Sequence, residues 1–211
     1  MPRTLTVRFL RVQRLEAGVM TTPTIALFAK YPRAGEAKTR LSPLLGDEGA
    51  ALVHRQLVER TLATMRQSGL PFAVHYTGAP AAEFRTWLGD DVPLVEQGDG
   101  DLGARLARVE APAILLGADI PGLSAKHLRA AAQALEDVPV VIGPASDGGY
   151  YLLGFTQPVP ALLNDMPWGT DAVLGETQRR LDGFGIAYRL LEELGDCDRP
   201  EDLERWPELL P

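Results

Sequence analysis

The sequence predicts an α/β protein built on a largely parallel sheet, and two features carry this prediction. Apolar runs typical of strands alternate along the chain with longer segments typical of helices. The run Ile114–Leu116 is continuously apolar, as expected for a central parallel strand covered on both faces. Asp119 and Pro121 follow it, so this strand ends in a carboxylate. Because open α/β sheets bind ligands outside the carboxyl ends of their strands, Asp119 lies where a divalent metal or a polyphosphate would be handled.

The other elements follow from the same patterns. A strand at 25–29 precedes a helix at 47–67, which has acids in its first turn and an apolar stripe that includes Val53, Leu57 and Leu62. The remaining expected strands are 72–76, 92–95, 138–142, an apolar run from Tyr150 and 186–191. The remaining expected helices are 81–88, 104–109, 124–135 and one starting at Pro200. A further helix begins in the segment 167–171, with Thr170 or Asp171 as its cap, and runs to about Leu181.

Composition narrows the possible functions. A chain of 211 residues that is 45% hydrophobic and 23% charged can bury one substantial core, so we expect a single domain over 23–211. A net charge of -7 argues against nucleic acid as a partner, because a broad basic surface is missing. The sequence has no apolar run as long as a membrane span. A single cysteine, Cys197, excludes an internal disulfide and is compatible with a reducing cytoplasm.

Residues 1–22 are expected to form a poorly packed N-terminal extension. The stretch Met1–Gly18 carries four arginines and lacks the uninterrupted apolar core of a secretory signal. A transit-like arm is the alternative. The extension is the preferred interpretation because Met20-Thr-Thr-Pro leads directly into the first convincing strand.

A cationic loop follows the first strand. Lys30, Arg33, Lys38 and Arg40 fall within eleven positions, and Gly35 lets a ligand approach the backbone. The GxxxxGK[ST] spacing of a Walker loop is absent. A solvated basic loop would be the plainer explanation, but the position between a buried strand and a helix favours anion binding.

Two further segments place acids near strand ends. Asp147-Gly148-Gly149 is typical of a hairpin turn and could also contact a ligand. Asp196 and Asp198 alternate in an extended segment before Pro200, so both could face a metal shared with Asp119 if the last strand returns beside the central one. The alternatives are that Asp119 caps the helix from Ser124 and that Asp198 caps the helix from Pro200.

Several residues have structural as well as functional interpretations. Trp168 is either a packed aromatic residue or a lid over the site. The Gly/Asp-rich segment 97–103 is explained mostly by turn chemistry, with Asp101 as a helix cap, although its glycines could let a base or sugar lie against the backbone. His54, His75 and His127 lack the spacing of a ligand set or a triad and are expected to be structural or surface residues.

Five motifs in order resemble the rSAM/selenodomain-associated transferases, which are small glycosyltransferase-like proteins. The motifs span nearly the whole chain from Ile25 to Trp206. They are similar in part to 2-phospholactate guanylyltransferase, which shares the Lys-Thr-Arg-Leu element and the terminal acids. The motifs are Lys30-x-Pro-x-x-Gly35-x-x-Lys38-Thr-Arg40-Leu, Gly117-Ala-Asp119-x-Pro-Gly-Leu, Gly143-Pro-x-x-Asp147-Gly-Gly-Tyr150, Pro167-Trp168-Gly-Thr and Asp196-x-Asp198-x-Pro200-x-Asp202-Leu.

This resemblance implies a GT-A fold, a three-layer Rossmann-like arrangement with helices on both faces of the sheet. It implies a Mg²⁺ or Mn²⁺ ion held by Asp119, Asp196 and Asp198. The residues assigned to the nucleotide donor on this basis are Lys30, Gly35, Lys38, Arg40, Gly148, Gly149 and Trp168, and those assigned to catalysis are Lys38, Arg40, Asp119 and Asp147.

The expected activity is transfer from a nucleotide-diphospho-sugar to a small-molecule acceptor. Many GT-A glycosyltransferases carry an Asp-x-Asp pair at the central strand, and position 117 is Gly here. Nucleotidyl transfer from a nucleoside triphosphate is therefore the alternative, and a non-catalytic nucleotide-binding regulator is a third. In either reaction the leaving group gains negative charge, which a metal and the Lys/Arg cluster would stabilise. The sequence identifies no clear general base.

Overall fold

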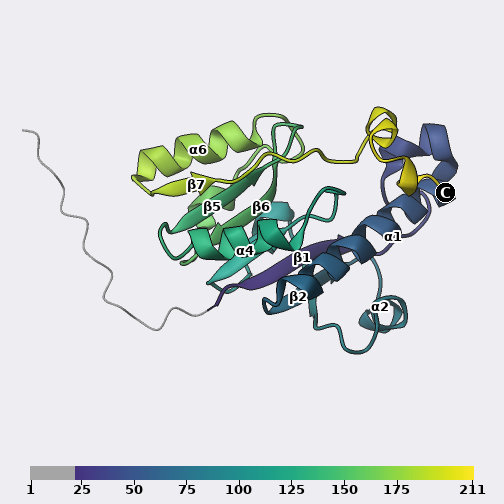
Figure 1. Ribbon diagram of the computed structural model, residues 1–211, viewed down its shortest axis with the longest axis horizontal. Coiled ribbons are helices and arrows are strands. Elements are labelled where there is room, and N and C mark those ends of the chain that lie inside the picture. The colour runs from purple at the N-terminus through teal and green to yellow at the C-terminus, as the bar shows by residue number, and fades with distance from the viewer. Residues whose placement is uncertain (1–21) are drawn as a thin grey trace, which may run out of the picture.

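The computed structural model describes residues 22–211 and has a seven-stranded sheet at its centre (Figure 1). The predicted extension, residues 1–22, lies outside the described residues except for its last position. The strand order across the sheet is β3-β2-β1-β4-β6-β5-β7. The strands are β1 (Thr24–Lys30), β2 (Phe72–Thr77), β3 (Leu94–Glu96), β4 (Ala113–Leu116), β5 (Val140–Pro144), β6 (Tyr150–Phe155) and β7 (Tyr188–Leu190).

The sheet is mostly parallel, as predicted, and one strand runs against the others. β1 pairs in parallel with β2 and β4, and β5 pairs in parallel with β7. β6 is antiparallel to both of its neighbours, β4 and β5. The hairpin between β5 and β6 confirms the turn predicted at Asp147-Gly148-Gly149. Because β4, β5 and β7 point the same way, the segments that follow them all emerge at one edge of the sheet.

Helices cover both faces of the sheet, which completes the predicted three-layer α/β fold. Alternate residues of β1 show the division, since Ile25 and Leu27 pack in one core cluster and Ala26 in the other. The first cluster lies under α1, α2 and α4, and the second under α3, α5 and α6. The helices are α1 (Ser42–Ser68), α2 (Ala81–Leu88), α3 (Leu102–Leu106), α4 (Ala125–Ala134), α5 (Pro160–Leu163) and α6 (Val173–Phe184).

Several element boundaries differ from the predictions. α1 begins at Ser42 rather than near residue 47, because Pro43 suits the first turn of a helix. Gly46, at φ 70°, then kinks this early part of α1. α6 begins at Val173, close to the predicted cap, and its N-cap residue is Ala172 rather than Thr170 or Asp171.

The C-terminal segment crosses the molecule. It leaves β7 at the edge of the sheet and runs to the N-terminal part of α1 (Figure 1). It ends in two short 3-10 helices, η2 (Pro200–Glu204) and η3 (Pro207–Leu209). A third core cluster fastens it there, in which Cys197, Leu203 and Leu209 pack with residues of α1 and of the 3-10 helix η1 (Thr39–Leu41).

Candidate active site

Carboxylates from three segments meet at the carboxyl edge of the sheet. The Gly117 N–H donates to Tyr151 O at 3.0 Å, and beyond this bond the chain leaves β4, so Asp119 lies just outside the sheet. Asp147 sits in the turn between β5 and β6. Asp196 and Asp198 lie on the crossing C-terminal segment. The sheet topology therefore gathers the acids that the sequence singled out.

The route taken by the terminal acids corrects one expectation. The last strand does not return beside the central strand, because β7 lies at the edge next to β5. The segment after β7 instead crosses the ends of the strands and bonds to them in turn. Ser146 N–H donates to Leu194 O at 3.1 Å, and Cys197 N–H donates to Asp119 O at 2.8 Å. The crossing segment, rather than the strand itself, places Asp198 beside Asp119.

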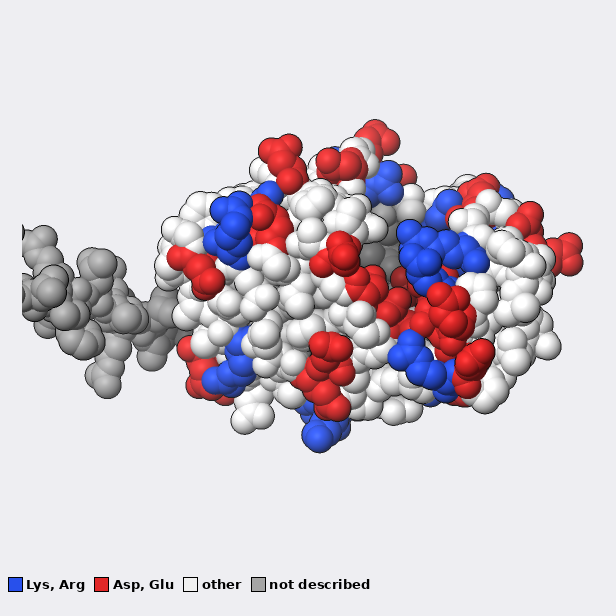
Figure 2. Space-filling model, turned by 90° about the horizontal axis from the view of Figure 1, so that it is seen from above, with Lys and Arg blue, Asp and Glu red and all other residues white. Residues whose placement is uncertain are grey.

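These acids line a pocket of about 340 Å³. Asp119, Asp147, Asp196 and Asp198 face it together with Arg40. The apolar part of the wall comes from both faces of the sheet. Phe28, Leu106, Leu115 and Leu153 belong to the second core cluster, and Leu116, Ile120 and Ala145 line the pocket as well. Figure 2 shows acidic and basic side chains meeting around a hollow in the half of the surface farther from the grey segment. The pocket thus combines a charged rim with an apolar interior.

Lys38 forms the most buried ionic contacts of the site. Its side chain is 4% exposed, and its Nζ lies 2.7 Å from Asp119 Oδ1 and 3.3 Å from Asp198 Oδ1. The same ammonium donates to the Cys197 carbonyl oxygen at 2.7 Å. Lys38 itself has a left-handed backbone, with a φ of 50°, which a non-glycine residue rarely adopts. One side chain thus ties the cationic loop to β4 and to the C-terminal segment.

Arg40 holds the outer side of this cluster. Its side chain is 58% exposed and its guanidinium donates to Asp198 Oδ2. Asp198 does not cap the final helix, since Asp202 accepts the N–H groups of Asp198 and Arg199 instead. Asp119 likewise does not cap α4, whose first turn is closed by Ser124 and His127. Both acids are therefore available to the pocket.

The carboxylates of the pocket differ in their electrostatic environment. Burial opposes ionisation of Asp198, but the Lys38 charge and the Arg40 hydrogen bond outweigh it and hold its pKa below the usual value. Burial would lower the pKa of Lys38, yet Asp119 and Asp198 raise it above the usual value. Asp196 is the opposite case, because burial and the nearby charge of Asp147 raise its pKa. The surroundings of Asp198 thus favour its ionised form, whereas those of Asp196 favour its protonated form.

The turn that carries Asp147 depends on two glycines. Gly148 has a φ of 87°, and a Cβ added to it would lie 2.4 Å from the Asp171 carbonyl oxygen. The turn therefore packs directly on the residues that precede α6. Gly149 donates its N–H to Asp147 Oδ1 at 2.8 Å and lines the pocket. Of the two glycines predicted to contact the donor, Gly149 faces the pocket and Gly148 mainly permits close packing.

Trp168 lines the pocket, as the lid interpretation requires, and it is also packed. Its ring meets that of Tyr150 edge to face, with centroids 6.2 Å apart. A Cβ on Gly103 would lie 3.1 Å from Trp168 Nε1 and 2.2 Å from Leu163 O, so α3 can approach this wall only with glycine there. Asp101 caps α3 as predicted, accepting the Ala104 N–H at 2.8 Å.

The sequence did not single out Phe28, Leu102 and Leu106 as pocket residues. Phe28 and Leu106 follow the pattern of ordinary core positions. Leu102 offered one signal in the sequence, because it is a large apolar residue inside a Gly/Asp-rich segment, and it is 41% exposed in the structure.

Of the seven residues predicted to contact the donor, four do not line the pocket: Lys30, Gly35, Lys38 and Gly148. Lys30 and Gly35 have their contacts within the cationic loop and α1 instead. Lys30 is the last residue of β1, and its Nζ pairs with Glu36 Oε2 at 3.3 Å. Gly35 has a φ of 74°, and its open side faces the Asp47 carboxylate. Neither residue lines the pocket of the described structure. The cationic loop thus forms part of its ion pairs within itself, as expected for a solvated basic loop.

The histidines have the structural roles that were expected. His54 Nε2 donates to the Lys30 carbonyl oxygen at 2.9 Å, and His75 stacks on Phe28 with ring centroids 5.1 Å apart. His127 Nδ1 accepts the Ser124 N–H at 3.1 Å in the capping box of α4.

The donor chemistry of the pocket suits a hard divalent cation. Four carboxylates face it against the two cations Lys38 and Arg40, and carboxylate oxygens are preferred ligands of Mg²⁺ and Mn²⁺. The carboxylates thus fit the ion by type and charge. Within residues 22–211, no three acidic, histidine or cysteine side chains are grouped closely enough to form a metal site.

Comparison with known proteins gives one family and a set of similar structures. Residues 60–170 match the family described as "Uncharacterized protein conserved in bacteria (DUF2064)". No curated protein matches the chain. A "putative nucleotide-diphospho-sugar transferase" from Desulfovibrio desulfuricans G20 shares 28% identity at a TM-score of 0.79, covering 85% of this chain and 83% of that one.

More distant structures share the fold. Rv0371c from Mycobacterium tuberculosis H37Rv, solved in complex with manganese, has 22% identity and a TM-score of 0.53 over 89% of this chain and 99% of its own. CMP:2-keto-3-deoxy-manno-octonic acid synthetase complexed with CTP has 18% identity and a TM-score of 0.54 over 90% and 98%. The structural neighbours thus include nucleotide-sugar transferases and nucleotidyltransferases. In the described part of the chain, no helix has the length and apolar character needed to cross a membrane.

Proposed function

The chain belongs to the DUF2064 family, and we propose that it is a metal-dependent transferase that uses a nucleotide-diphospho-sugar as its donor. One observation carries the proposal. Asp119, Asp147, Asp196 and Asp198 come from three separate segments and face one pocket with Arg40, at the sheet edge where α/β folds bind ligands. The similarity to the Desulfovibrio desulfuricans protein supports the choice of donor class.

The residues of the pocket divide the work by their chemistry. Arg40, exposed at the rim, is free to turn one face of its guanidinium to a diphosphate. A bound Mg²⁺ or Mn²⁺ would neutralise the leaving diphosphate, with Asp119, Asp196 and Asp198 as its protein ligands. Asp147 is held in place by the Gly149 N–H and offers its carboxylate to the reacting groups from the wall of the same pocket. Trp168, Tyr150 and Gly149 line the pocket and offer aromatic and backbone surface against which the transferred group can be oriented.

Nucleotidyl transfer is the second candidate, and Gly117 is the residue that favours it. This position lacks the first acid of the Asp-x-Asp pair common in GT-A glycosyltransferases. The resemblance to rSAM/selenodomain-associated transferases supports the sugar-nucleotide alternative, and that to 2-phospholactate guanylyltransferase supports the triphosphate alternative. We also propose one transferase domain over 23–211 and a cytoplasmic setting, where the single buried thiol of Cys197 would stay reduced.

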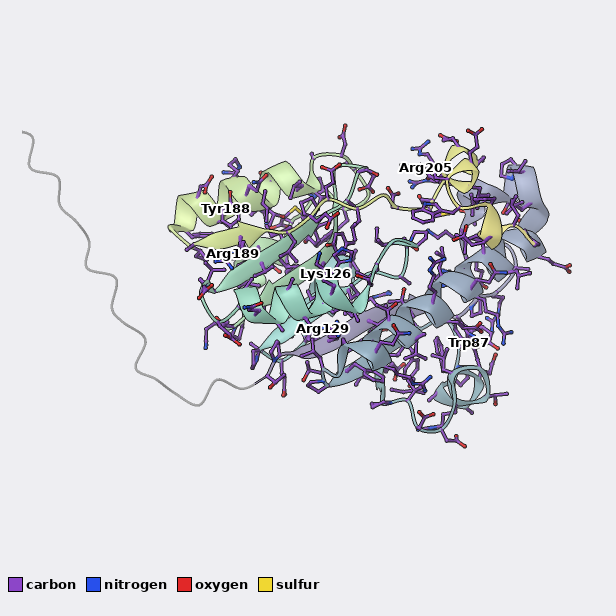
Figure 3. All side chains as sticks on the ribbon, in the orientation of Figure 1. Trp87, Lys126, Arg129, Tyr188, Arg189 and Arg205 are labelled. Carbon is purple, nitrogen blue, oxygen red and sulfur yellow. The ribbon has the colours of Figure 1, made fainter. Side chains whose placement is uncertain are left out.

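Thermal-shift measurements test the proposal. With Mn²⁺ present, nucleotide-diphospho-sugars should raise the melting temperature, and Arg40→Ala should weaken that stabilisation by about tenfold in apparent affinity, since a charge-assisted contact is lost. Arg129→Ala, on the exposed face of α4, is the matched control and should bind like the native chain (Figure 3).

The products then decide between the candidates. Release of a nucleoside diphosphate supports glycosyl transfer, and release of diphosphate from a triphosphate supports nucleotidyl transfer. Stabilisation without turnover across a broad acceptor set would favour a nucleotide-binding regulator. If no nucleotide stabilises the chain with metal present, all three candidates are wrong.

A further inference from the structure

The hydrogen-bonding capacity of Lys38 is already fully used. A lysine ammonium has three N–H donors, and Lys38 Nζ has three acceptors at hydrogen-bonding distance. These are Asp119 Oδ1 at 2.7 Å, Cys197 O at 2.7 Å and Asp198 Oδ1 at 3.3 Å. The side chain is 4% exposed. In this arrangement Lys38 has no donor left for a phosphate, and its side chain is not among those that line the pocket.

The acceptors of Lys38 include two of the three carboxylates assigned to the metal. The ammonium lies against one oxygen of Asp119 and one of Asp198, which is where a cation shared by these two acids would be attracted. Two positive charges in contact repel strongly in a partly buried site, since the effective dielectric constant there is far below that of water. Lys38 and a divalent cation therefore compete for the same carboxylates.

We propose, building on the function proposed above, that Lys38 is a counter-ion of Asp119 and Asp198 that is exchanged for the divalent cation. Binding of the metal by Asp119 and Asp198 displaces the ammonium from both acids. The freed Lys38 then turns toward the donor diphosphate, so the metal makes the phosphate contact available. Metal binding and nucleotide binding are coupled through one side chain, and each ligand raises the affinity for the other.

The surroundings of Lys38 suit this exchange. Residues 31–38 form an irregular loop between β1 and η1, so moving the side chain breaks no sheet ladder. Lys38 also has an uncommon left-handed backbone, with φ at 50° and ψ at 40°, and its present contacts hold it there. The exchange therefore needs movement of the Lys38 side chain alone, since Ala37 and Leu41, which flank it, are buried in the core.

Lysine labelling of the native chain tests the exchange directly. The chain has three lysines, Lys30, Lys38 and Lys126. Lys126 lies exposed on α4 (Figure 3) and serves as the internal reference. Reductive methylation followed by mass spectrometry should find Lys38 protected without metal and labelled at least tenfold faster with saturating Mn²⁺. Labelling of Lys126 should stay constant.

Electron paramagnetic resonance of Mn²⁺ in the same samples separates the possible failures. If Mn²⁺ binds while Lys38 stays protected, the exchange is wrong and the proposed metal dependence stands. If Mn²⁺ does not bind at millimolar concentration, both the exchange and the metal dependence are wrong.

A substitution gives an independent test, because removing Lys38 should strengthen the binding of the metal rather than weaken it. Lys38→Met should bind Mn²⁺ alone at least tenfold more tightly than the native chain, because the competing charge is gone, and should bind the nucleotide more weakly. Lys126→Met, the control, should change neither affinity. A lysine that contacted only phosphate would leave the affinity for Mn²⁺ alone unchanged, and that result would overturn the proposal. If Lys38→Met fails to fold, the labelling of the native chain decides.

Discussion

The two sides of the pocket both carry aspartates, but the aspartates of one side are paired with cations and those of the other side are not. On one side, Asp119 and Asp198 are paired with Lys38, and Asp198 also with Arg40. On the other side, Asp147 and Asp196 accept hydrogen bonds from neutral donors, the Gly149 N–H and the Ser146 hydroxyl. Within residues 22–211, neither Asp147 nor Asp196 has a cationic partner within 4.0 Å.

This difference shows how one pocket can treat a cation in two ways. At Asp119 and Asp198 an incoming cation must replace a charge that is already there. At Asp147 and Asp196 it adds a charge that is missing, and it relieves the repulsion that raises the pKa of Asp196. Substitutions on the two sides should consequently have effects of different size and, for stability, of opposite sign.

Asp119→Asn should give the largest effect. The change is nearly isosteric and removes one charge, so the fold should persist while metal-dependent turnover falls on the order of 10²-fold or more. Stabilisation by Mg²⁺ should vanish as well, as measured by thermal shift with and without the ion. Asp137→Asn is the control, because Asp137 pairs with Arg189 on the exposed surface, 3.1 Å from its Nη2. Full turnover in the Asp119→Asn variant would show that Asp119 is not a metal ligand.

Asp198→Asn should lower stability. It leaves the buried Lys38 ammonium with Asp119 and the Cys197 carbonyl, so the loss is smaller than for a fully orphaned charge. We expect the free energy of unfolding to fall by about 1–3 kcal/mol, measured by urea denaturation at pH 7. An unchanged midpoint would mean that the ion pairs of Asp198 contribute little net stability.

The contribution of Asp198 to the free energy of unfolding should depend on pH. The folded-state pKa of Asp198 lies below its unfolded value, so its stabilising contribution is present above the unfolded pKa of about 3.9. That contribution is lost as the pH falls through the lower, folded-state pKa. The stability difference between the native chain and Asp198→Asn should therefore narrow below about pH 4.

Much of the fold could be predicted because its signals are local. The continuous apolar run before Asp119, the Asp-Gly-Gly turn and the Asp101 cap are each encoded within a few residues, and the structure has all three. The helix start at Ser42 was missed because the acidic residues Asp47 and Glu48 gave a stronger signal for the first helical turn than Pro43 did.

For the site, the sequence predicted which residues lie at the ends of strands, but not which charges pair with one another. That Asp119 and Asp147 would lie at one edge follows from parallel topology, but the partners of each charge depend on contacts between distant residues. Lys38 and Asp198 are 160 positions apart, and their pairing depends on the crossing of the C-terminal segment. Lys30 shows the same limit, because its choice of Glu36 is set by the path of the loop. Apolar wall residues such as Phe28 carry no chemical signal at all.

Asp196→Asn should give the smallest effect and the opposite sign. The folded-state pKa of Asp196 is raised by burial and by Asp147, so the ionised carboxylate is less stable in the folded chain than in the unfolded one. Asparagine removes that charge and still accepts the Ser146 hydroxyl that now donates to Asp196 Oδ1 at 3.1 Å. Because the side chain is only partly buried, the gain in unfolding free energy at pH 7 should be at most about 1 kcal/mol.

The gain should shrink as the pH falls toward the unfolded pKa, since the native carboxyl is then protonated in the folded state. Urea denaturation of both chains at pH 7 and pH 4.5 measures this, and a loss of stability at pH 7 would show that Asp196, like Asp198, has a stabilising cationic partner.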